Sequence, residues 1–252
     1  MTNILRIEMY SPEILVLNME DNENKNTFTD RFVEELIEKI SEIKSNAGIK
    51  VVIFRGLKDI FCAGAAKESL MKLKDGNLSV KDLVLSEMVL DIPVPTIALM
   101  EGSALGGGFV LGLCCDMIIL NERAMYGSNF TNLGFTPGMG CTGFLKSLVG
   151  EYIANEMMFS GRLFKGRSFR ERGLANYVLS SDLMFKKAVD IAFDIAGKPR
   201  KTLEILKYSL NLKKRQALQE ARVNEDFMHK ISFAQHEVLD IVNERYNEIR
   251  RN

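Results

Sequence analysis

Three consecutive glycines, Gly106 to Gly108, separate a short apolar strand predicted over residues 96–100 from a long apolar run. The run, residues 109–120, is typical of a buried helix followed by a further strand. The first N–H groups of a helix have no partner within the helix and lie at the positive end of its dipole. The stretch therefore predicts either a holder for an oxygen that carries negative charge or a tight, closely packed strand-to-helix turn.

A second glycine element lies upstream. Residues 51–56, VVIFRG, are predicted to form a buried strand, and FCAGAAKESL at residues 61–70 gives a glycine turn that runs into a helical pattern. If one backbone N–H from each turn pointed at the same carbonyl oxygen, the two elements together would form an oxyanion hole.

With both elements in view, the sequence resembles the crotonase (enoyl-CoA hydratase/isomerase) superfamily over nearly its whole length. The landmarks FCAGA, PVPTIALMEGSALGGG, CDMIIL and LGFTPGMG follow in the order of that family between residues 61 and 140. The resemblance implies an α/β fold, with a spiral of ββα units over residues 1–198 and a C-terminal helical region, residues 199–252, that closes the site and builds a trimer. It also implies that Ala65 N–H and Gly107 N–H are the two donors of the hole.

Composition excludes several classes of function. Lys plus Arg number 33 and Asp plus Glu number 33, so zero net charge gives no global electrostatic case for nucleic acid or an anionic membrane. We identify neither a signal peptide nor a transmembrane helix and expect a cytoplasmic protein. The four cysteines show no CxxC spacing and are expected to be buried thiols, with no metal site.

Local patterns predict the elements around these turns. LRIEMY and ILVLNM, separated by residues 11–13, predict a β-hairpin, and Thr29 is a suitable N-cap for a helix with an apolar face. Residues 70–90 are polar and rich in lysine, with a predicted break at residues 75–77, and form either a lid or a solvated surface helix. Residues 203–249 have apolar residues at helical spacing.

The resemblance also shows what this chain lacks. Hydratases of the superfamily carry two glutamates that activate water, and the matching positions here hold Val110 and Phe130. Neither side chain can transfer a proton, so the hole is kept while the acid–base pair is lost. Decarboxylation generates an enolate without a base, because CO2 leaves its electron pair on carbon and the hole stabilises the charge. Two apolar side chains would also help to desolvate a substrate carboxylate.

NLGFTPGMG, GGGFV and MHKISF resemble one branch of the superfamily, the decarboxylases of polyketide β-branching cassettes. The resemblance implies a cofactor-independent enzyme that acts on a 3-methylglutaconyl chain held by the phosphopantetheine of an acyl carrier protein, in a site that would also suit coenzyme A analogues. The product would be a β-methyl-branched enoyl thioester. The partners implied are the carrier protein and further copies of the chain, as a homotrimer or a dimer of trimers.

Members of that branch carry a lysine in the lid and a histidine in the C-terminal helix. His229 in MHKISF matches the histidine, and its ordinary pKa near ~6.5 suits a general acid that protonates a dienolate, although a packing role is the alternative. His236 lacks the match and is expected to be exposed. Lys81 is our candidate for the cation that orients the substrate, and Lys72 or Lys74 could replace it.

Further residues are expected to bind the acyl thioester, and for Tyr126 and Asn129 ordinary packing is the alternative. The predicted binding residues are Ala63, Gly64, Gly106, Val110, Tyr126, Asn129, Phe130 and Gly138. Two other functions stay open. One is an enoyl-CoA hydratase or isomerase with unconventional acid–base residues, and the other is a non-catalytic subunit that binds acyl groups or a carrier protein.

Overall fold

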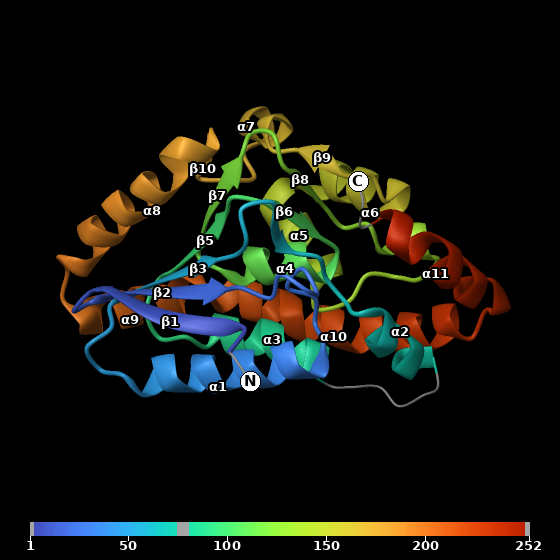
Figure 1. Cartoon of the computed structure of the whole chain (residues 1–252), viewed down its shortest axis with the longest axis horizontal. Helices are drawn as coiled ribbons and strands as arrows, with labels where there is room; N and C mark the ends of the chain where they lie inside the picture. Colours follow the sequence, from blue (N-terminus) through green and yellow to red (C-terminus); the bar gives the residue numbers. More distant parts are fainter. Residues whose placement is uncertain (1–2, 75–80, 250–252) are drawn as a thin grey trace.

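A computed structural model describes residues 3–74 and 81–249 of the chain (Figure 1). The strands are β1 (Leu5–Ser11), β2 (Ile14–Met19), β3 (Val51–Arg55), β4 (Ile60–Cys62), β5 (Thr96–Met100), β6 (Ser103–Leu105), β7 (Met117–Asn121), β8 (Met125–Gly127), β9 (Phe164–Lys165) and β10 (Tyr177–Leu179). The helices are α1 (Asp30–Ser45), α2 (Lys67–Lys74), α3 (Lys81–Leu90), α4 (Gly107–Cys114), the 3-10 turn η1 (Phe130–Leu133), α5 (Cys141–Val149), α6 (Glu151–Ser160), α7 (Arg167–Arg172), α8 (Ser181–Ala196), α9 (Arg200–Leu210), α10 (Leu212–Phe233) and α11 (His236–Ile249).

The larger sheet has the strand order β1-β2-β3-β5-β7-β10, and every neighbouring pair except β1 and β2 is parallel. Strands β2 and β5 are buried along their whole length, as expected for parallel strands that are covered on both faces. Helix α8 packs on one face against β2, β3, β5 and β7 (Figure 1). The other face points to the main core, which contains residues of α1, α3 and α4.

The second sheet is built by the strands that follow those of the first. Its order is β4-β6-β8-β9, with β4, β6 and β8 parallel to one another. The chain therefore alternates between the sheets: β3 is followed by β4, β5 by β6 and β7 by β8, with helices after each pair. This arrangement confirms the predicted α/β fold with a spiral of ββα units, and it brings the turns after β4 and β6 to neighbouring positions.

Helices α9 to α11 pack against the spiral, and the boundary predicted after residue 198 falls between α8 and α9. Lys207 of α9 is buried, donates to the carbonyl oxygen of Val94 at 2.8 Å and forms an ion pair with Asp116 at 2.9 Å. Burial alone would raise the pKa of Asp116, but the charge of Lys207 and hydrogen bonds from Lys207, Asn211 and Thr96 hold that pKa below its usual value. The C-terminal helices also contribute buried residues to the main core.

Several local predictions are confirmed. Thr29 is the N-cap of α1 and its Oγ1 accepts a hydrogen bond from Phe32 N–H at 3.2 Å. Strands β1 and β2 form the antiparallel hairpin, and all four cysteines are buried thiols that form no disulfide within the described residues. The lysine-rich segment forms two helices, α2 and α3, whereas the break predicted at residues 75–77 lies outside the described residues.

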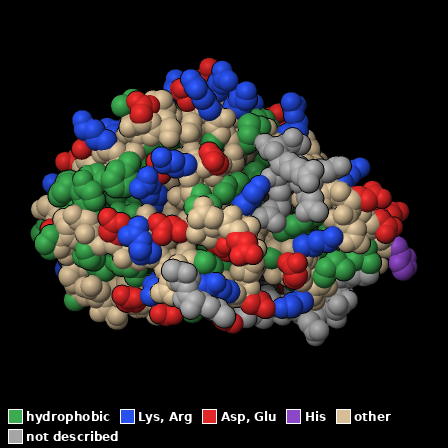
Figure 2. Space-filling model, viewed as in Figure 1, with side chains coloured by type: hydrophobic (Ala, Val, Ile, Leu, Met, Phe, Trp, Pro, Cys, Tyr) green, Lys and Arg blue, Asp and Glu red, His purple; other side chains and the backbone are tan. Residues whose placement is uncertain are grey.

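Charges of both signs are intermixed over the face of the molecule that Figure 2 shows, in keeping with the balanced composition. Within residues 3–74 and 81–249, none of the helices combines the length and the hydropathy that a membrane span needs.

Candidate active site

The two glycine elements lie directly against each other. Gly64 has a φ of +83°, and a Cβ built on it would lie 2.7 Å from the carbonyl oxygen of Leu105 and 3.3 Å from the backbone nitrogen of Gly107. A side chain at position 64 would therefore both strain the turn and push the two backbones apart. The glycine turn after β4 and the start of α4 thus meet as the sequence predicts.

The two expected donors are available. Gly107 is the first residue of α4, so its N–H has no partner within the helix. Within the described residues, neither Ala65 N–H nor Gly107 N–H donates a hydrogen bond to another part of the chain. The carbonyl oxygen of Gly64 accepts from Phe28 N–H at 2.8 Å, and that of Gly106 accepts from Val110 N–H at 3.1 Å. Each donor peptide is therefore fixed and polarised from its carbonyl side.

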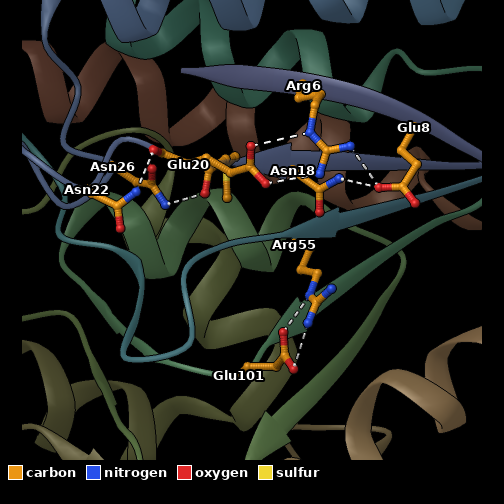
Figure 3. A network of polar contacts seen from close by, with 9 residues as sticks. Arg6, Glu8, Asn18, Glu20, Asn22, Asn26, Arg55 and Glu101 are labelled. Carbon is orange, nitrogen blue, oxygen red and sulfur yellow. Dashed lines mark hydrogen bonds and ion pairs between the residues drawn. The ribbon is translucent and has the colours of Figure 1, made fainter. Parts of the chain in front are cut away.

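Asn26, whose side chain Figure 3 shows, holds the strand that leads into the turn with Ala65. Its side-chain amide donates to the carbonyl oxygens of Met19 at 3.0 Å and Phe61 at 2.9 Å, and its Oδ1 accepts from Asp21 N–H at 2.9 Å. The next residue back, Lys25, accepts from Ala63 N–H at 3.1 Å through its carbonyl oxygen. Asn26 is fully buried, so these bonds tie the loop after β2 to the strand that precedes the turn.

A cavity of about 40 Å³ adjoins the donors. It is lined by Ala63, Gly64, Ala65, Leu70, Leu105, Gly106, Gly107, Asn129, Phe130, Leu133, Phe135 and Tyr246. This volume exceeds the ~10 to 15 Å³ that one water needs but is far below the ~300 Å³ at which ligand pockets start. The cavity therefore takes a carbonyl group, and a longer acyl chain requires neighbouring side chains or helices to move.

The lining of the cavity is apolar except at two side chains. Tyr246 donates its hydroxyl to the carbonyl oxygen of Ala65 at 2.8 Å. Asn129 is only 6% exposed, and within the described residues its side-chain amide makes no hydrogen bond to the protein. None of the lining residues is a carboxylate, and Phe130 is one of them. Val110 is fully buried on α4 and does not line the cavity.

His229 lies one layer away from the cavity. Its Nε2 is 2.8 Å from the carbonyl oxygen of Thr136, to which it donates, and its ring packs edge-on against Phe135 with the centroids 6.3 Å apart. Phe135 lines the cavity and His229 does not. Burial lowers the pKa of His229, and the carbonyl of Thr136 and the charge of Asp226 partly offset that effect.

The segment between η1 and α5 links His229 to the hole. Glu225, one helical turn before His229 on α10, accepts from Gly140 N–H at 2.7 Å and from the N–H of Thr142 at 2.8 Å. Met139, the residue before Gly140, places its Sδ where a Cβ on Gly107 would come within 2.9 Å. Burial raises the pKa of Glu225, and its hydrogen bonds partly offset the rise. The segment therefore contacts α4, the helix that begins at Gly107, and α10 holds the segment in place.

The remaining predicted residues fall into two groups. Tyr126 is fully buried in the core rather than at the cavity, and its hydroxyl donates to the carbonyl oxygen of Met100 at 2.7 Å, so packing is the role that the structure shows. Lys72 forms an exposed ion pair with Asp30 at 2.8 Å. The side chains of Lys74 and Lys81 lie outside the described residues, although their backbones belong to α2 and α3.

Two residues that the sequence did not single out belong to this region, namely Tyr246 and Glu225. Tyr246 follows Val238 and Val242 at intervals of four on the buried side of α11. A tyrosine at such a position signals a hydroxyl that needs an internal partner. Glu225 is likewise a carboxylate on the buried face of an amphipathic helix, which is a signal for a buried hydrogen-bond network. His236 is exposed, as expected.

Comparison with known proteins agrees with this geometry. The model of the enoyl-CoA hydratase/isomerase family matches residues 10–251. The chain is 34% identical to the bacillaene synthase decarboxylase PksI of Bacillus subtilis over 225 residues, 89% of this chain and 90% of that protein. A solved structure of a dehydratase/decarboxylase couple from polyketide β-branching has a TM-score of 0.93 at 32% identity, covering 96% and 99% of the two chains. The ECH2 decarboxylase domain of CurF from Lyngbya majuscula has a TM-score of 0.91 at 30% identity, covering 97% and 100%.

Proposed function

Because the chain belongs to the enoyl-CoA hydratase/isomerase family, and within it to the decarboxylases of polyketide β-branching, we propose that it removes CO2 from a 3-methylglutaconyl thioester on an acyl carrier protein. One observation carries the proposal. The backbone N–H groups of Ala65 and Gly107, which donate to no other described residue, adjoin an apolar cavity whose described lining contains no carboxylate. Such a site stabilises an enolate but cannot activate water.

The first chemical step breaks the bond between the carboxylate carbon and the carbon next to it. CO2 leaves, and the electron pair stays on the substrate, where it is conjugated through the double bond into the thioester carbonyl. The negative charge that develops on the carbonyl oxygen receives hydrogen bonds from Ala65 N–H and Gly107 N–H. One such donor typically contributes a factor of ~10² to 10³ in rate, so the hole is the main source of catalysis in this proposal.

The second step adds a proton to the dienolate and restores a neutral enoyl thioester, so that each turnover consumes one proton. His229 is the proposed donor, and it recovers its proton from solvent. Since Phe135 separates the imidazole from the cavity, direct transfer requires the Phe135 ring to rotate aside when substrate is bound. The pKa of His229 lies below its ordinary value, so only part of the imidazole is protonated at neutral pH.

Orientation of the substrate carboxylate is the third part of the proposal. Asn129 supports it, because it lines the cavity and its amide makes no hydrogen bond to the protein within the described residues. A neutral amide can orient the carboxylate by hydrogen bonds. Because the carboxylate loses its charge when CO2 forms, a lysine that stabilised this charge would slow the step more than an amide does. Lys81 remains our candidate for a cation at the mouth of the site, with Lys72 and Lys74 as alternatives.

We further propose that the thioester arrives on phosphopantetheine, without another cofactor, and that the chain works in the cytoplasm as a trimer or a dimer of trimers. Apolar residues on the outer face of α10 support self-association. Val223, Phe227 and Ile231 follow one another at intervals of four and are 75%, 65% and 53% exposed. A stripe of this kind on a helix is typical of a surface that another protein covers.

Mass spectrometry of a 3-methylglutaconyl carrier protein incubated with this chain tests the function directly. We expect the acyl group to lose the mass of CO2. If the acyl group kept its mass while crotonyl-CoA was hydrated, the enzyme would be a hydratase with unconventional acid–base residues. If neither thioester changed although both bound, the chain would be a non-catalytic binding subunit.

Substitution of Asn129 by Asp tests the orientation of the carboxylate. The new negative charge should weaken binding of glutaconyl thioesters, which carry a carboxylate, by about tenfold or more, and leave binding of the neutral 3-methylcrotonyl thioester less affected. Asn224→Asp, on the exposed face of α10, is the matched control. Equal effects on both ligands would show that Asn129 only packs. Separate alanine substitutions of Lys81, Lys72 and Lys74 identify the lysine that orients the carboxylate. Loss of that lysine should weaken binding of the glutaconyl thioester more than binding of the 3-methylcrotonyl thioester.

A further inference from the structure

Tyr246 joins the C-terminal helix α11 to the turn that carries one of the oxyanion donors. Its side chain is 5% exposed, and its hydroxyl donates to the carbonyl oxygen of Ala65 at 2.8 Å across a sequence separation of 181 residues. The same side chain lines the cavity beside Ala65 and Gly107. The contact therefore lies at the hole itself, although the proposed chemistry does not use it.

Ala65 is held through the peptide group on each side of its Cα. The peptide group before the Cα of Ala65 consists of the Gly64 carbonyl and Ala65 N–H, and Phe28 N–H donates to this carbonyl at 2.8 Å. The peptide group after the Cα begins with the carbonyl of Ala65, to which the hydroxyl of Tyr246 donates. Since two backbone dihedral angles connect these peptides, fixing both peptide planes limits the direction in which Ala65 N–H can point. A donor contributes to catalysis only when its direction matches the developing oxyanion.

Helix α11 reaches this position because it packs closely on Gly134, the residue that ends η1. A Cβ on Gly134 would lie 3.2 Å from Cδ1 of Ile241 and 3.4 Å from Cγ2 of Val238. The contacts at Gly134 position α11. The hydroxyl of Tyr246 then links α11 by a hydrogen bond to the turn that contains Ala65. The cavity of about 40 Å³ beside it must enlarge to accept an acyl chain.

We propose that Tyr246 is a positioning residue for the oxyanion hole: its hydroxyl aligns Ala65 N–H when α11 is docked, so that the hole is complete only when the helix is closed over the substrate. This inference rests on the proposed function for its consequence in catalysis. Its structural part, the alignment of one hydrogen-bond donor, applies to any thioester carbonyl in the site.

Tyr246→Phe removes only the hydroxyl, and Tyr208→Phe, at a side chain 63% exposed on α9, is the matched control. The probe is 3-methylcrotonyl-pantetheine with an isotope-labelled thioester carbonyl, whose infrared stretching frequency falls when the oxyanion donors bind it. We expect a smaller fall in frequency in Tyr246→Phe than in the unsubstituted protein, and roughly five- to tenfold lower kcat for decarboxylation with little change in KM. Tyr208→Phe should match the unsubstituted protein in both.

A second pair of variants covers the case in which Tyr246→Phe does not fold. Gly134→Ala and Gly173→Ala both place a side chain at a left-handed backbone position, with φ of +81° and +69°, but only position 134 faces α11, while position 173 has no atom within 4 Å. We expect Gly134→Ala to reduce the frequency shift and Gly173→Ala to leave it unchanged. An unchanged carbonyl frequency in both Tyr246→Phe and Gly134→Ala would overturn the inference, as would a change in KM alone. The frequency is read on a bound thioester without turnover, so it separates failure of this inference from failure of the proposed decarboxylation.

Discussion

The imidazole of His229 rests on the backbone of Gly138. A Cβ built on Gly138 would lie 2.5 Å from Cε1 and 3.1 Å from Nε2 of His229. The same Nε2 donates to the carbonyl oxygen of Thr136, two residues earlier. One short stretch of backbone therefore both supports the ring and receives its hydrogen bond, and this stretch also contains Met139, which touches the oxyanion helix.

Gly138→Ala should displace the ring of His229, because the new methyl group would overlap it. If His229 is the proton donor, we expect product formation to fall by about 10-fold to 10²-fold, or the ratio of the two protonated products to change, while binding of 3-methylcrotonyl-pantetheine stays close to normal. Turnover and product analysis by mass spectrometry and NMR measure these effects. Normal turnover with an unaltered product ratio would contradict a role for the ring in this position.

The rate of product formation should depend on pH through His229. An acid must be protonated to act, and burial holds the pKa of His229 below its ordinary value. The rate of protonation should therefore be highest on the acidic side and fall as pH rises through a value below ~6.5. His229→Ala should lower the rate by about 10² to 10⁴ and remove this dependence.

His236 is the control for that experiment. It begins α11 and is exposed, so His236→Ala should retain both the rate and the pH profile. A profile that survived in His229→Ala but vanished in His236→Ala would reverse the assignment of the acid.

Glu225 should contribute to stability through the turn before α5. Its carboxylate is fully buried and accepts from Gly140 N–H and from the N–H and Oγ1 of Thr142. Glu225→Ala would leave one buried donor, Gly140 N–H, and two partly buried donors of Thr142 without their acceptor, and we expect a loss of about 2 kcal/mol or more in the free energy of unfolding. Urea denaturation followed by circular dichroism measures the change. Glu220→Gln, on the exposed side of the same helix, should change the free energy by less than about 0.5 kcal/mol. If Glu225→Ala also changed the free energy of unfolding by less than about 0.5 kcal/mol, water would be replacing the carboxylate as the acceptor.

Local signals in the sequence account for the parts of the site that were predicted. Apolar runs gave the strands of the large sheet, Thr29 gave the start of α1, and glycine at positions 64 and 107 gave the close approach of two backbones. Each of these signals comes from a residue whose own conformation or burial decides the structure. The meeting of Gly64 with Gly107 followed because parallel strands present their carboxyl ends at one edge.

Contacts between distant segments could not be predicted in the same way. Tyr246 meets Ala65, and Glu225 meets Gly140, only because helices packed in three dimensions bring those side chains there. The place of Phe135 between His229 and the cavity depends on side-chain packing and has no counterpart in residue spacing. Tyr126 shows the same limit, since an aromatic residue with a hydroxyl suits a binding pocket and a hydrogen-bonded core equally well.

The contribution of Gly107 N–H can be separated from the space around it by two substitutions. A Cβ at position 107 would come within 2.8 Å of Cε2 of Phe28, whose ring is buried, and 2.9 Å of Sδ of Met139. Gly107→Ala introduces that crowding but keeps the N–H, whereas Gly107→Pro removes the N–H and places its Cδ where the amide hydrogen was. Because Gly107 is the first residue of α4, proline is compatible with the helix there.

We therefore expect decarboxylation by Gly107→Pro to be slower than that by Gly107→Ala by about 10² to 10³, the usual effect of one oxyanion donor. Circular dichroism and thermal unfolding of both variants check that they fold alike. The rates are compared at saturating substrate, and binding of 3-methylcrotonyl-pantetheine to both variants measures the additional effect of the proline Cδ at the place where the carbonyl oxygen binds. Equal rates in two folded variants would mean that Gly107 N–H does not hold the oxyanion, and the proposed mechanism would then depend on Ala65 alone.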